Sequence, residues 1–330
     1  MPRLTLAAAE TLVVDAIMRG NVAAGVAASV ARALVGAEAA GQGNHGLRRV
    51  VAYTGQARTG KVDGHAVPVA IRPAPGVLVV DAGDGFAYPA LDRAVELLPE
   101  IARAQGIAMA AIRRSHHAGV AGMTVERLAD RGLVALMVAN APAAMAPWGG
   151  RTPLYGTNPF AFAAPLDGQE PVVIDLSLSK VARGNVMTAR QKGLSIPEGW
   201  ALDRDGNPTT DAAAAMAGTM VPAGEAKGAA LALMVEMLAA GLTGGNFAYE
   251  AGSLFEDAGP SVNLGHIIIA LDPVRIGGAS TTARMAELAT RVADEPGARL
   301  PGRRGQTARR QAIEQGIEVE DDVLAAIARL

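Results

Sequence analysis

The sequence predicts an α/β fold in which an outer domain, built from both ends of the chain, carries an inserted lobe. Short apolar runs alternate with longer segments of helical periodicity, which is typical of sheets covered by helices. Half of the 330 residues are hydrophobic, enough for a sizeable core. The centre of the chain is rich in turn residues, so we expect residues 1–139 and 266–330 to form the outer domain and 140–265 the inserted lobe.

The N-terminal part alternates helices and strands. Thr5 can cap a helix over 5–18, and an Ala-rich helix over 22–40 ends at a Gly-rich turn over 41–46. Helical spacing returns over 47–59, and a Pro- and Gly-rich passage fills 60–75. The elements expected next are a strand over 77–81, an amphipathic helix over 88–105, a strand over 106–112, a helix that includes 125–130 and a strand over 133–140.

Turn residues dominate the centre of the chain. Pro, Gly, Asn and Thr crowd 141–165 and 198–211, with a short apolar piece at 160–163 and a predicted strand over 172–176. The stretch 226–242 is the longest apolar helix that the sequence predicts, although Lys227 and Glu236 interrupt it. A strand over 265–271, a helix over 281–295 and a closing helix over 321–330 complete the outer domain.

Charge and composition exclude several classes of protein. Thirty Lys and Arg against 32 Asp and Glu leave a net charge of −2, which argues against nucleic-acid binding. The absence of cysteine excludes disulfides, thiolate metal sites and a cysteine nucleophile. The N-terminus lacks a basic region followed by an unbroken apolar run, and no stretch of about 18 apolar residues is free of charges. We therefore expect a cytoplasmic protein that does not engage a membrane.

One Gly-rich segment matches the dinucleotide-binding pattern without its context. Gly41, Gly43 and Gly46 fit G-x-G-x-x-G, but this pattern indicates a Rossmann site only where it follows a strand and opens a helix. Here an Ala-rich helix precedes it, and Asp63, 20 residues beyond Gly43, lies in a turn-rich passage rather than at a strand end. We interpret the segment as a turn between two helices.

The same turn carries the main catalytic candidate. His45 is followed three and four residues later by Arg48 and Arg49. Histidine exchanges protons near neutral pH, and a guanidinium holds a carboxylate through a two-pronged contact. Reduction of a 2-oxo acid needs both groups, since the carbonyl oxygen takes a proton as hydride reaches the carbon. On spacing alone, a capping or surface histidine explains the pattern equally well.

Three further motifs are candidates for ligand binding. His116 and His117 follow a predicted buried strand, where α/β proteins place ligand groups. No metal site is expected there, because no third ligand stands at a useful spacing. Lys227, in the first turn of the long apolar helix, suits a phosphate or carboxylate as well as it suits solvent. The basic pair Arg303 and Arg304 suits an adenosine phosphate or a solvated face.

Taken together, several segments resemble the type-2 malate/L-lactate dehydrogenases. That family also contains sulfolactate, ureidoglycolate and diketogulonate oxidoreductases, and reductases of the cyclic imino acids piperideine- and pyrroline-2-carboxylate. The resemblance runs in the family's order over nearly the whole chain. The matching segments are His45-Gly46-x-x-Arg49, Ser115-His116-His117-Ala118-Gly119, Ala146-Pro147-Trp148-Gly149-Gly150, Gly156-Thr157-Asn158-Pro159, Ile196-Pro197-Glu198-Gly199-Trp200-Ala201-Leu202-Asp203, Pro208-Thr209-Thr210-Asp211, Lys227-Gly228 and Arg299-Leu300-Pro301-Gly302.

The resemblance implies a dimeric NAD(P)-dependent oxidoreductase without a Rossmann domain. Its inserted lobe binds the cofactor, its active site lies in the cleft between lobes, and it interconverts a small 2-oxo acid and a 2-hydroxy acid by hydride transfer at C2. His45 is then the proton donor, His117 a second catalytic histidine at the nicotinamide, and Arg49 and Thr157 contact the substrate. The residues implied to contact the cofactor are His117, Gly119, Asp175, Leu176, Ser177, Lys227 and, in the loop 302–308, Arg303 and Arg304. Because arginine matches a 2′-phosphate, the last two favour NADP over NAD.

Two departures from the family's pattern bear on the proton relay, while Glu225 and the stretch 176–179 are further departures near the residues implied to contact the cofactor. Asn44 stands where many relatives have a serine that relays protons with the neighbouring histidine, and Asn185 stands near a residue that is charged in some relatives. An amide cannot pass a proton as a hydroxyl does. The alternative function is therefore reduction of a cyclic ketimine, which can arrive already protonated. A non-catalytic binding protein on the same fold is a third possibility, against which His45, Arg49 and His117 argue.

The long apolar helix supports a homodimer. Its apolar residues are Leu231, Leu233, Met234, Val235, Met237 and Leu238. A helix that is apolar nearly all round must be buried on most sides, either within its lobe or against a second copy of the chain. A small carboxylate and a second copy of the chain are thus the expected partners.

Overall fold

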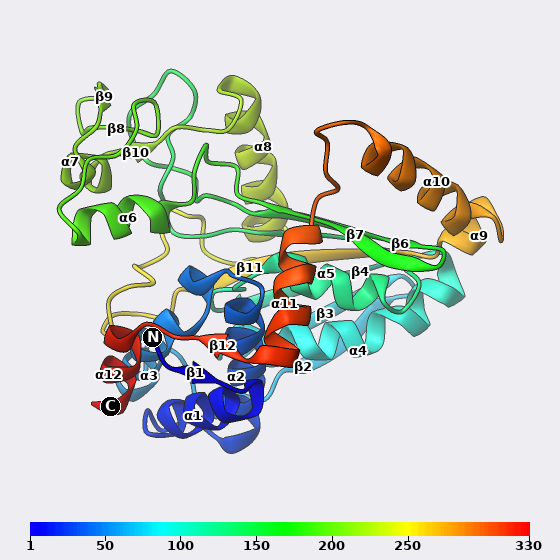
Figure 1. The fold of residues 1–330 in the computed structure, drawn as a ribbon, viewed down its shortest axis with the longest axis horizontal. Coiled ribbons are helices and arrows are strands. Elements are labelled where there is room, and N and C mark those ends of the chain that lie inside the picture. The colour runs from blue at the N-terminus through cyan, green and yellow to red at the C-terminus, as the bar shows by residue number, and fades with distance from the viewer.

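A mixed seven-stranded sheet lies at the centre of the computed structural model, which describes residues 1–330 (Figure 1). The strands are β2 (Val69–Ala74), β3 (Val77–Asp81), β4 (Ile107–Ser115), β5 (Val134–Ala139), β6 (Phe160–Leu166), β7 (Gln169–Leu176) and β11 (Leu264–Leu271). Their order is β2-β3-β4-β11-β5-β6-β7, and only the pair β3 and β4 is parallel. Because β11 lies between β4 and β5, segments far apart in the chain build one sheet.

Helices cover one face of this sheet in two layers. Helices α4 (Ala87–Gln105) and α5 (Ala121–Ala129) pack on the strands. Behind them lie α1 (Leu6–Met18), α2 (Ala24–Ala39) and α3 (Val50–Arg58), and buried Ala, Val and Leu side chains join both layers into the largest core cluster. The C-terminal helices α11 (Arg303–Gln315) and α12 (Asp321–Ala328) join this side, where β1 (Arg3–Leu4) pairs with β12 (Ile317–Glu318). The two termini therefore lie close together (Figure 1).

The other face of the sheet carries a smaller lobe. It consists of α6 (Arg183–Gln191), α7 (Ala212–Ala217), α8 (Ala226–Glu236), a π-helical turn over Met237–Gly241, and a small sheet of β8 (Ala201–Leu202), β9 (Pro208–Thr209) and β10 (Thr219–Met220). Its core, which includes Met145, Val186 and Val235, packs on Val138 and Ile267 of the sheet. Helices α9 (Pro273–Gly277) and α10 (Thr281–Asp294) stand out at the edge of the body (Figure 1). No helix is long and apolar enough to cross a membrane.

Most of the elements predicted from the sequence are confirmed. The side chain of Thr5 caps α1 by accepting a hydrogen bond from the amide of Ala8 at 3.2 Å, and β3 has the predicted bounds. Helices α6, α7, α9 and α11 were not predicted. The expected loop over 302–308 was wrong, because this segment forms the start of α11.

The division into residues 1–139, 140–265 and 266–330 stays a prediction. Strands β6 and β7, which fall in its central part, extend the central sheet from β5. The predicted central part and the predicted outer domain therefore share one sheet.

Candidate active site

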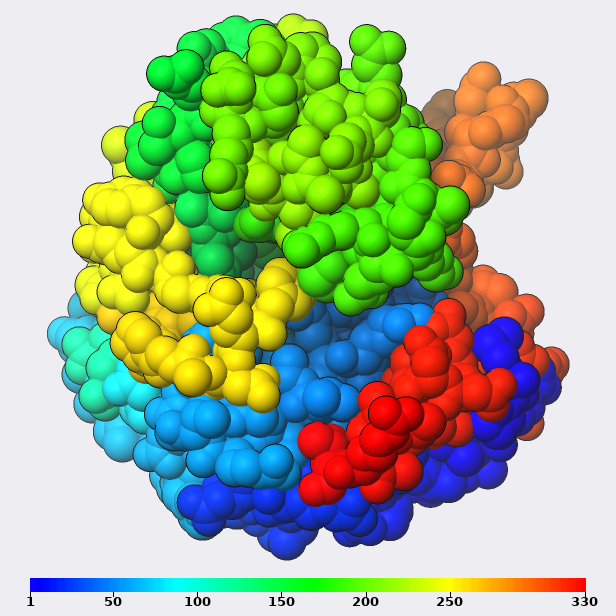
Figure 2. All heavy atoms as spheres, turned by 90° about the vertical axis from the view of Figure 1, so that its left-hand side faces the viewer, coloured from blue at the N-terminus to red at the C-terminus, as the bar shows by residue number.

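A cavity of about 700 Å³ opens between the smaller lobe and the N-terminal helices. Figure 2 shows the surface recessed where the green lobe, the yellow segment near residue 250 and the blue N-terminal part meet. Cavities of this size suit small-molecule ligands. The residues predicted from the sequence that line it are His45, Arg49, His117, Gly119, Thr157, Asp175, Leu176, Ser177 and Arg304. Lys227 and Arg303 do not line it.

His45 ends a single 3₁₀ turn, Gly43–His45, that follows α2. Its imidazole stacks on that of His117, with ring centroids 5.2 Å apart, and its Nδ1 is buried without a hydrogen-bond partner. Burial and, secondly, the neighbouring Arg49 guanidinium lower the pKa of His45 to about 4. His45 is therefore a neutral base at neutral pH, and an anion bound beside Arg49 would raise its pKa.

Arg49 lies one turn further along, in the 3₁₀ turn Leu47–Arg49, and is buried. Its Nε donates to the backbone oxygen of Asn44 at 2.8 Å, and its guanidinium lies 4.9 Å from the ring centroid of Phe255. Its two terminal nitrogens make no hydrogen bond within the chain, so they can grip a carboxylate. Arg48 instead forms an ion pair with Glu320. Of the two neighbouring arginines, only Arg49 lines the cavity.

Tyr53 was not predicted as a site residue. Its fully buried hydroxyl lies 2.7 Å from Nδ1 of His117 and 3.3 Å from the hydroxyl of Tyr88. Burial raises the pKa of both tyrosines, and burial followed by the Arg49 charge lowers the pKa of His117 well below its usual value. A phenol that donates to Nδ1 leaves the hydrogen of a neutral imidazole on Nε2. The only sequence signal was the position of Tyr53 four residues after Arg49.

Asn44 and Asn185, which depart from the family's pattern at the proton relay, contact each other. Nδ2 of Asn44 lies 3.4 Å from Oδ1 of Asn185, which is in the first turn of α6. Gly184 permits this approach, because a Cβ there would lie 3.2 Å from the Asn44 amide nitrogen. The amide pair joins α6 to the His45 turn but carries no hydroxyl that can relay a proton.

The loop 253–258 carries Phe255 in the cavity wall. Hydrogen bonds to backbone carbonyls hold this loop against the main body. The buried Lys61 ammonium donates to three carbonyl groups of the loop 253–258, at 2.5, 2.8 and 3.4 Å. The side-chain amide of Gln56 donates to the Leu254 oxygen at 3.0 Å and, at 3.2 Å, to the Glu256 oxygen that Lys61 also binds. These bonds hold Phe255 over the guanidinium of Arg49, and neither Lys61 nor Gln56 was predicted from the sequence as a site residue.

Thr157 is positioned by a buried carboxylate on α8. Glu236 accepts hydrogen bonds from the Asn158 side chain at 2.8 Å, from the Gly156 amide at 3.2 Å and from the Ala248 amide at 3.1 Å. Burial raises the pKa of Glu236. Glu236 thereby joins the turn that carries Thr157 to Ala248, which also lines the cavity, a role that its place in an apolar helix did not reveal.

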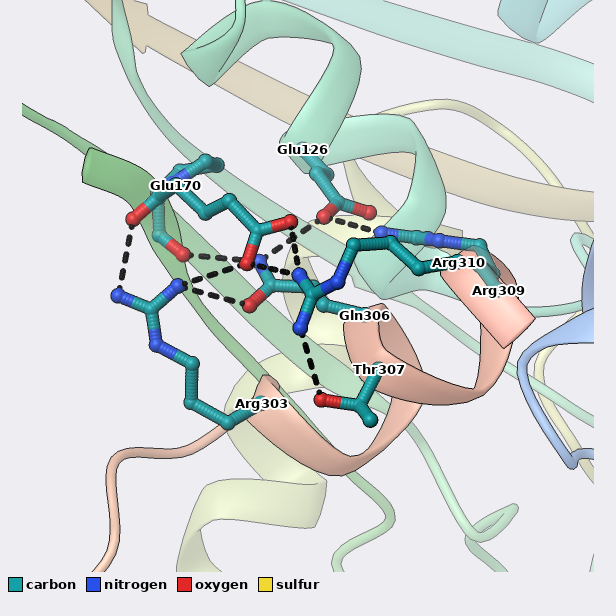
Figure 3. Close-up of polar contacts among 8 residues, drawn as sticks. Glu126, Glu170, Arg303, Gln306, Thr307, Arg309 and Arg310 are labelled. Atoms are coloured by element: carbon teal, nitrogen blue, oxygen red, sulfur yellow. Dashed lines mark hydrogen bonds and ion pairs between the residues drawn. The ribbon is translucent and has the colours of Figure 1, made fainter. Parts of the chain in front are cut away.

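Arg303 and Arg304 begin α11 but have different surroundings. Nη1 of Arg303 forms an ion pair with Glu170 at 3.1 Å, and Arg310 contacts the same carboxylate at 2.5 Å (Figure 3). Arg304 is exposed and forms no ion pair within the chain. It lines the main cavity and also an adjoining cavity of about 200 Å³, which share Asp175 as well. Arg304 is therefore the better placed of the two for a phosphate.

The site fits a nicotinamide dinucleotide. The two cavities meet at Arg304, which gives room for an extended ligand with a cation partway along it. Gly41, Gly43 and Gly119 offer bare backbone to the cavity. Nowhere do three or more His, Asp or Glu side chains gather in a group that could hold a metal ion.

Comparison with known proteins gives consistent matches over the whole chain. The family model described as malate/L-lactate dehydrogenase matches residues 4–328. A (2R)-3-sulfolactate dehydrogenase (NADP(+)) of Chromohalobacter salexigens is 50% identical over 99% of this chain and 99% of its own. A Delta(1)-pyrroline-2-carboxylate/Delta(1)-piperideine-2-carboxylate reductase of Pseudomonas putida is 40% identical over 93% of this chain and 91% of its own. The crystal structure of delta1-piperideine-2-carboxylate reductase from Pseudomonas syringae has a TM-score of 0.94 at 37% identity, covering 100% of this chain and 99% of its own.

Proposed function

The chain belongs to the malate/L-lactate dehydrogenase family of NAD(P)-dependent oxidoreductases, and from this premise we propose that it interconverts a small 2-hydroxy acid and the corresponding 2-oxo acid. The observation that carries the proposal is the placement of neutral His45 beside Arg49, whose terminal nitrogens lack a partner, in one cavity. The 50% identity to a sulfolactate dehydrogenase supports a hydroxy-acid substrate.

Each proposed role follows from the geometry of this chain. The fork of Arg49 holds the C1 carboxylate. When bound, the nicotinamide exchanges a hydride with C2. His45 takes the hydroxyl proton in the oxidative direction and returns it to the oxygen in the reductive one, and the carboxylate on Arg49 raises the pKa of His45 from about 4 toward the range that this exchange needs. Nε2 of His117, with Nδ1 held by Tyr53, donates to the same oxygen.

Reduction of a cyclic ketimine is the second candidate. The contact between Asn44 and Asn185 favours it, because a protonated ketimine needs no relay. The 40% identity to a ketimine reductase, against 50% to the sulfolactate dehydrogenase, ranks it lower.

Cofactor oxidation, followed by absorbance, separates the candidates. The panel consists of pyruvate, oxaloacetate, 3-sulfopyruvate, piperideine-2-carboxylate and pyrroline-2-carboxylate. We expect the highest kcat/KM with a 2-oxo acid. Faster reduction of a cyclic imine would favour the second candidate, and cofactor binding without any turnover would indicate a binding protein.

We propose NADP as the preferred cofactor, with Arg304 rather than Arg303 at the 2′-phosphate. Arg304→Ala should raise the KM for NADPH about 10-fold and leave the KM for NADH nearly unchanged, because one charge-assisted contact is lost. Arg303→Ala is the matched control, since its guanidinium is already paired with Glu170. Equal effects of Arg304→Ala on both cofactors, or a larger NADPH effect from Arg303→Ala, would contradict the assignment.

We also propose that the chain is a homodimer. It exposes 14839 Å², whereas a compact monomer of 33.6 kDa exposes about 12,700 Å². Part of the excess is apolar: Leu231 and Met237 of the α8 segment are 45% and 59% exposed, and Leu288 of the protruding α10 is 66% exposed. An obligate dimer buries upwards of about 2,000 Å² summed over both chains, so the excess exposed by one chain is large enough for its share of such an interface. A cytoplasmic location stays a prediction.

Size exclusion coupled to light scattering measures the assembly. At low micromolar concentration we expect twice the single-chain mass of 33.6 kDa. Met237→Glu should shift the species toward the single chain, because it places a charge in the apolar face that the proposed dimer buries. An active wild-type protein at 33.6 kDa would contradict the dimer.

A further inference from the structure

Arg183 lines the cavity, and the mechanism proposed above gives its guanidinium no role. It is partly buried at the start of α6, and its one hydrogen bond runs from Nη1 to the backbone oxygen of Ala143 at 2.8 Å. It forms no ion pair within the chain, and burial lowers its pKa. The only carboxylate in the cavity wall is Asp175, which accepts a hydrogen bond from the Gly122 amide at 2.9 Å. The cavity therefore holds more positive charge than the protein itself balances.

The contacts of α6 place Arg183 at the substrate end of the cavity. Asn185 reaches Asn44, whose backbone oxygen accepts the hydrogen bond from Nε of Arg49. The guanidinium of Arg183 is turned toward Ala143, whose amide donates to the Ala248 carbonyl at 2.9 Å. That wall continues into the segment with Phe255. Arg304, by contrast, lies where the two cavities meet.

We propose that Arg183 binds a second anionic group on the substrate, a sulfonate or carboxylate carried by C3, and so makes the site selective for dianionic over monoanionic 2-oxo acids. The inference rests on the proposed function, in which Arg49 takes the C1 carboxylate. A partly buried cation without a counter-charge is costly to keep desolvated. A dianion supplies the missing charge, and the planar guanidinium can offer two parallel hydrogen bonds to either oxyanion.

Steady-state kinetics with three 2-oxo acids tests the inference. The substrates are 3-sulfopyruvate, oxaloacetate and, as the monoanion, pyruvate. Arg183→Met should lower kcat/KM for the better dianion about 10- to 100-fold, mainly through KM, and leave kcat/KM for pyruvate unchanged. Arg190→Met, on the same helix but exposed and outside the cavity, is the matched control and should change none of the three. The dianion with the larger loss identifies the group as sulfonate or carboxylate.

Three outcomes would overturn the inference. These are equal losses for all three substrates, a rise in the KM for the cofactor as large as that for the dianion, or a wild-type preference for pyruvate. Arg183→Lys should restore part of the lost kcat/KM, since it keeps the charge without the fork. A variant that only disturbs folding would show no such recovery.

Binding of unreactive acids separates this inference from the proposed function. Calorimetry with 3-sulfopropionate, succinate and propionate reports anion binding without turnover. Tighter binding of a dianion than of propionate, lost in Arg183→Met, would support the subsite even if no 2-oxo acid is reduced, in which case only the proposed function fails. If neither dianion binds the wild type more tightly than propionate does, the subsite does not exist.

Discussion

Replacing His45 with alanine should lower kcat by about 10²- to 10⁴-fold, the range typical for loss of a general acid or base. Of the chain's five histidines, only His45 and His117 line the cavity. His45 directly follows Asn44, whose backbone oxygen accepts the hydrogen bond from Arg49, so in the proposed mechanism it lies beside the substrate that Arg49 binds. Burial and the Arg49 charge lower the pKa of His45 to about 4, and in the proposed mechanism the substrate carboxylate on Arg49 raises it again. A methyl group in its place can neither take nor return the proton.

The control for this experiment is His65→Ala. His65 is exposed and lies outside the cavity, where its Nε2 is 3.2 Å from the side-chain oxygen of Asn21. We expect this variant to keep the wild-type kcat. If His45→Ala folds, as judged by circular dichroism and thermal melting, and still turns over at a near-normal rate, His45 is not the proton-transferring group.

Arg49→Lys should raise KM for the 2-oxo acid sharply. Lysine keeps the charge but lacks the planar fork, and it cannot reproduce both the bond to Asn44 and the contact with Phe255. Loss of a partly buried charge-assisted contact costs about 2–5 kcal/mol. At the lower bound this is a loss of about 30-fold in kcat/KM.

Arg48→Lys provides the comparison for that measurement. Arg48 is half-exposed and forms ion pairs with Glu320 and Asp322, away from the cavity. A lysine there can keep much of this surface interaction, which is itself weak. Should Arg48→Lys rather than Arg49→Lys raise KM, the substrate carboxylate binds to a different arginine from the one proposed.

The fold was predictable from the sequence where local signals suffice. Helix α1 has a capping threonine and regular apolar spacing, and β3 is a run of β-branched and leucine residues. The position of β11 between β4 and β5 depends on pairing across more than 120 residues, which no local pattern encodes. Helix α11 was missed because its sequence is polar almost all round, and contacts with the distant Glu126 and Glu170 stabilise it (Figure 3).

The site residues, like the elements of the fold, could be predicted only where neighbouring residues gave a local signal. His45 and Arg49 stood out because they lie within five residues of each other. Arg183 and Lys61 were missed because the cavity and the loop that give them roles form only in the folded chain. The difference between Arg303 and Arg304 was also hidden, since it depends on Glu170, 133 residues before Arg303.

The way in which the loop 253–258 is held has a consequence for how the enzyme could be redesigned. Lys61 and Gln56 bind main-chain carbonyls, which every amino acid carries. Side chains of the loop can therefore be exchanged while the loop keeps its course. A smaller residue at position 255 would enlarge the cavity for a bulkier substrate. The hydrogen bonds from Lys61 and Gln56 to the main chain would still hold the loop in place in such a variant.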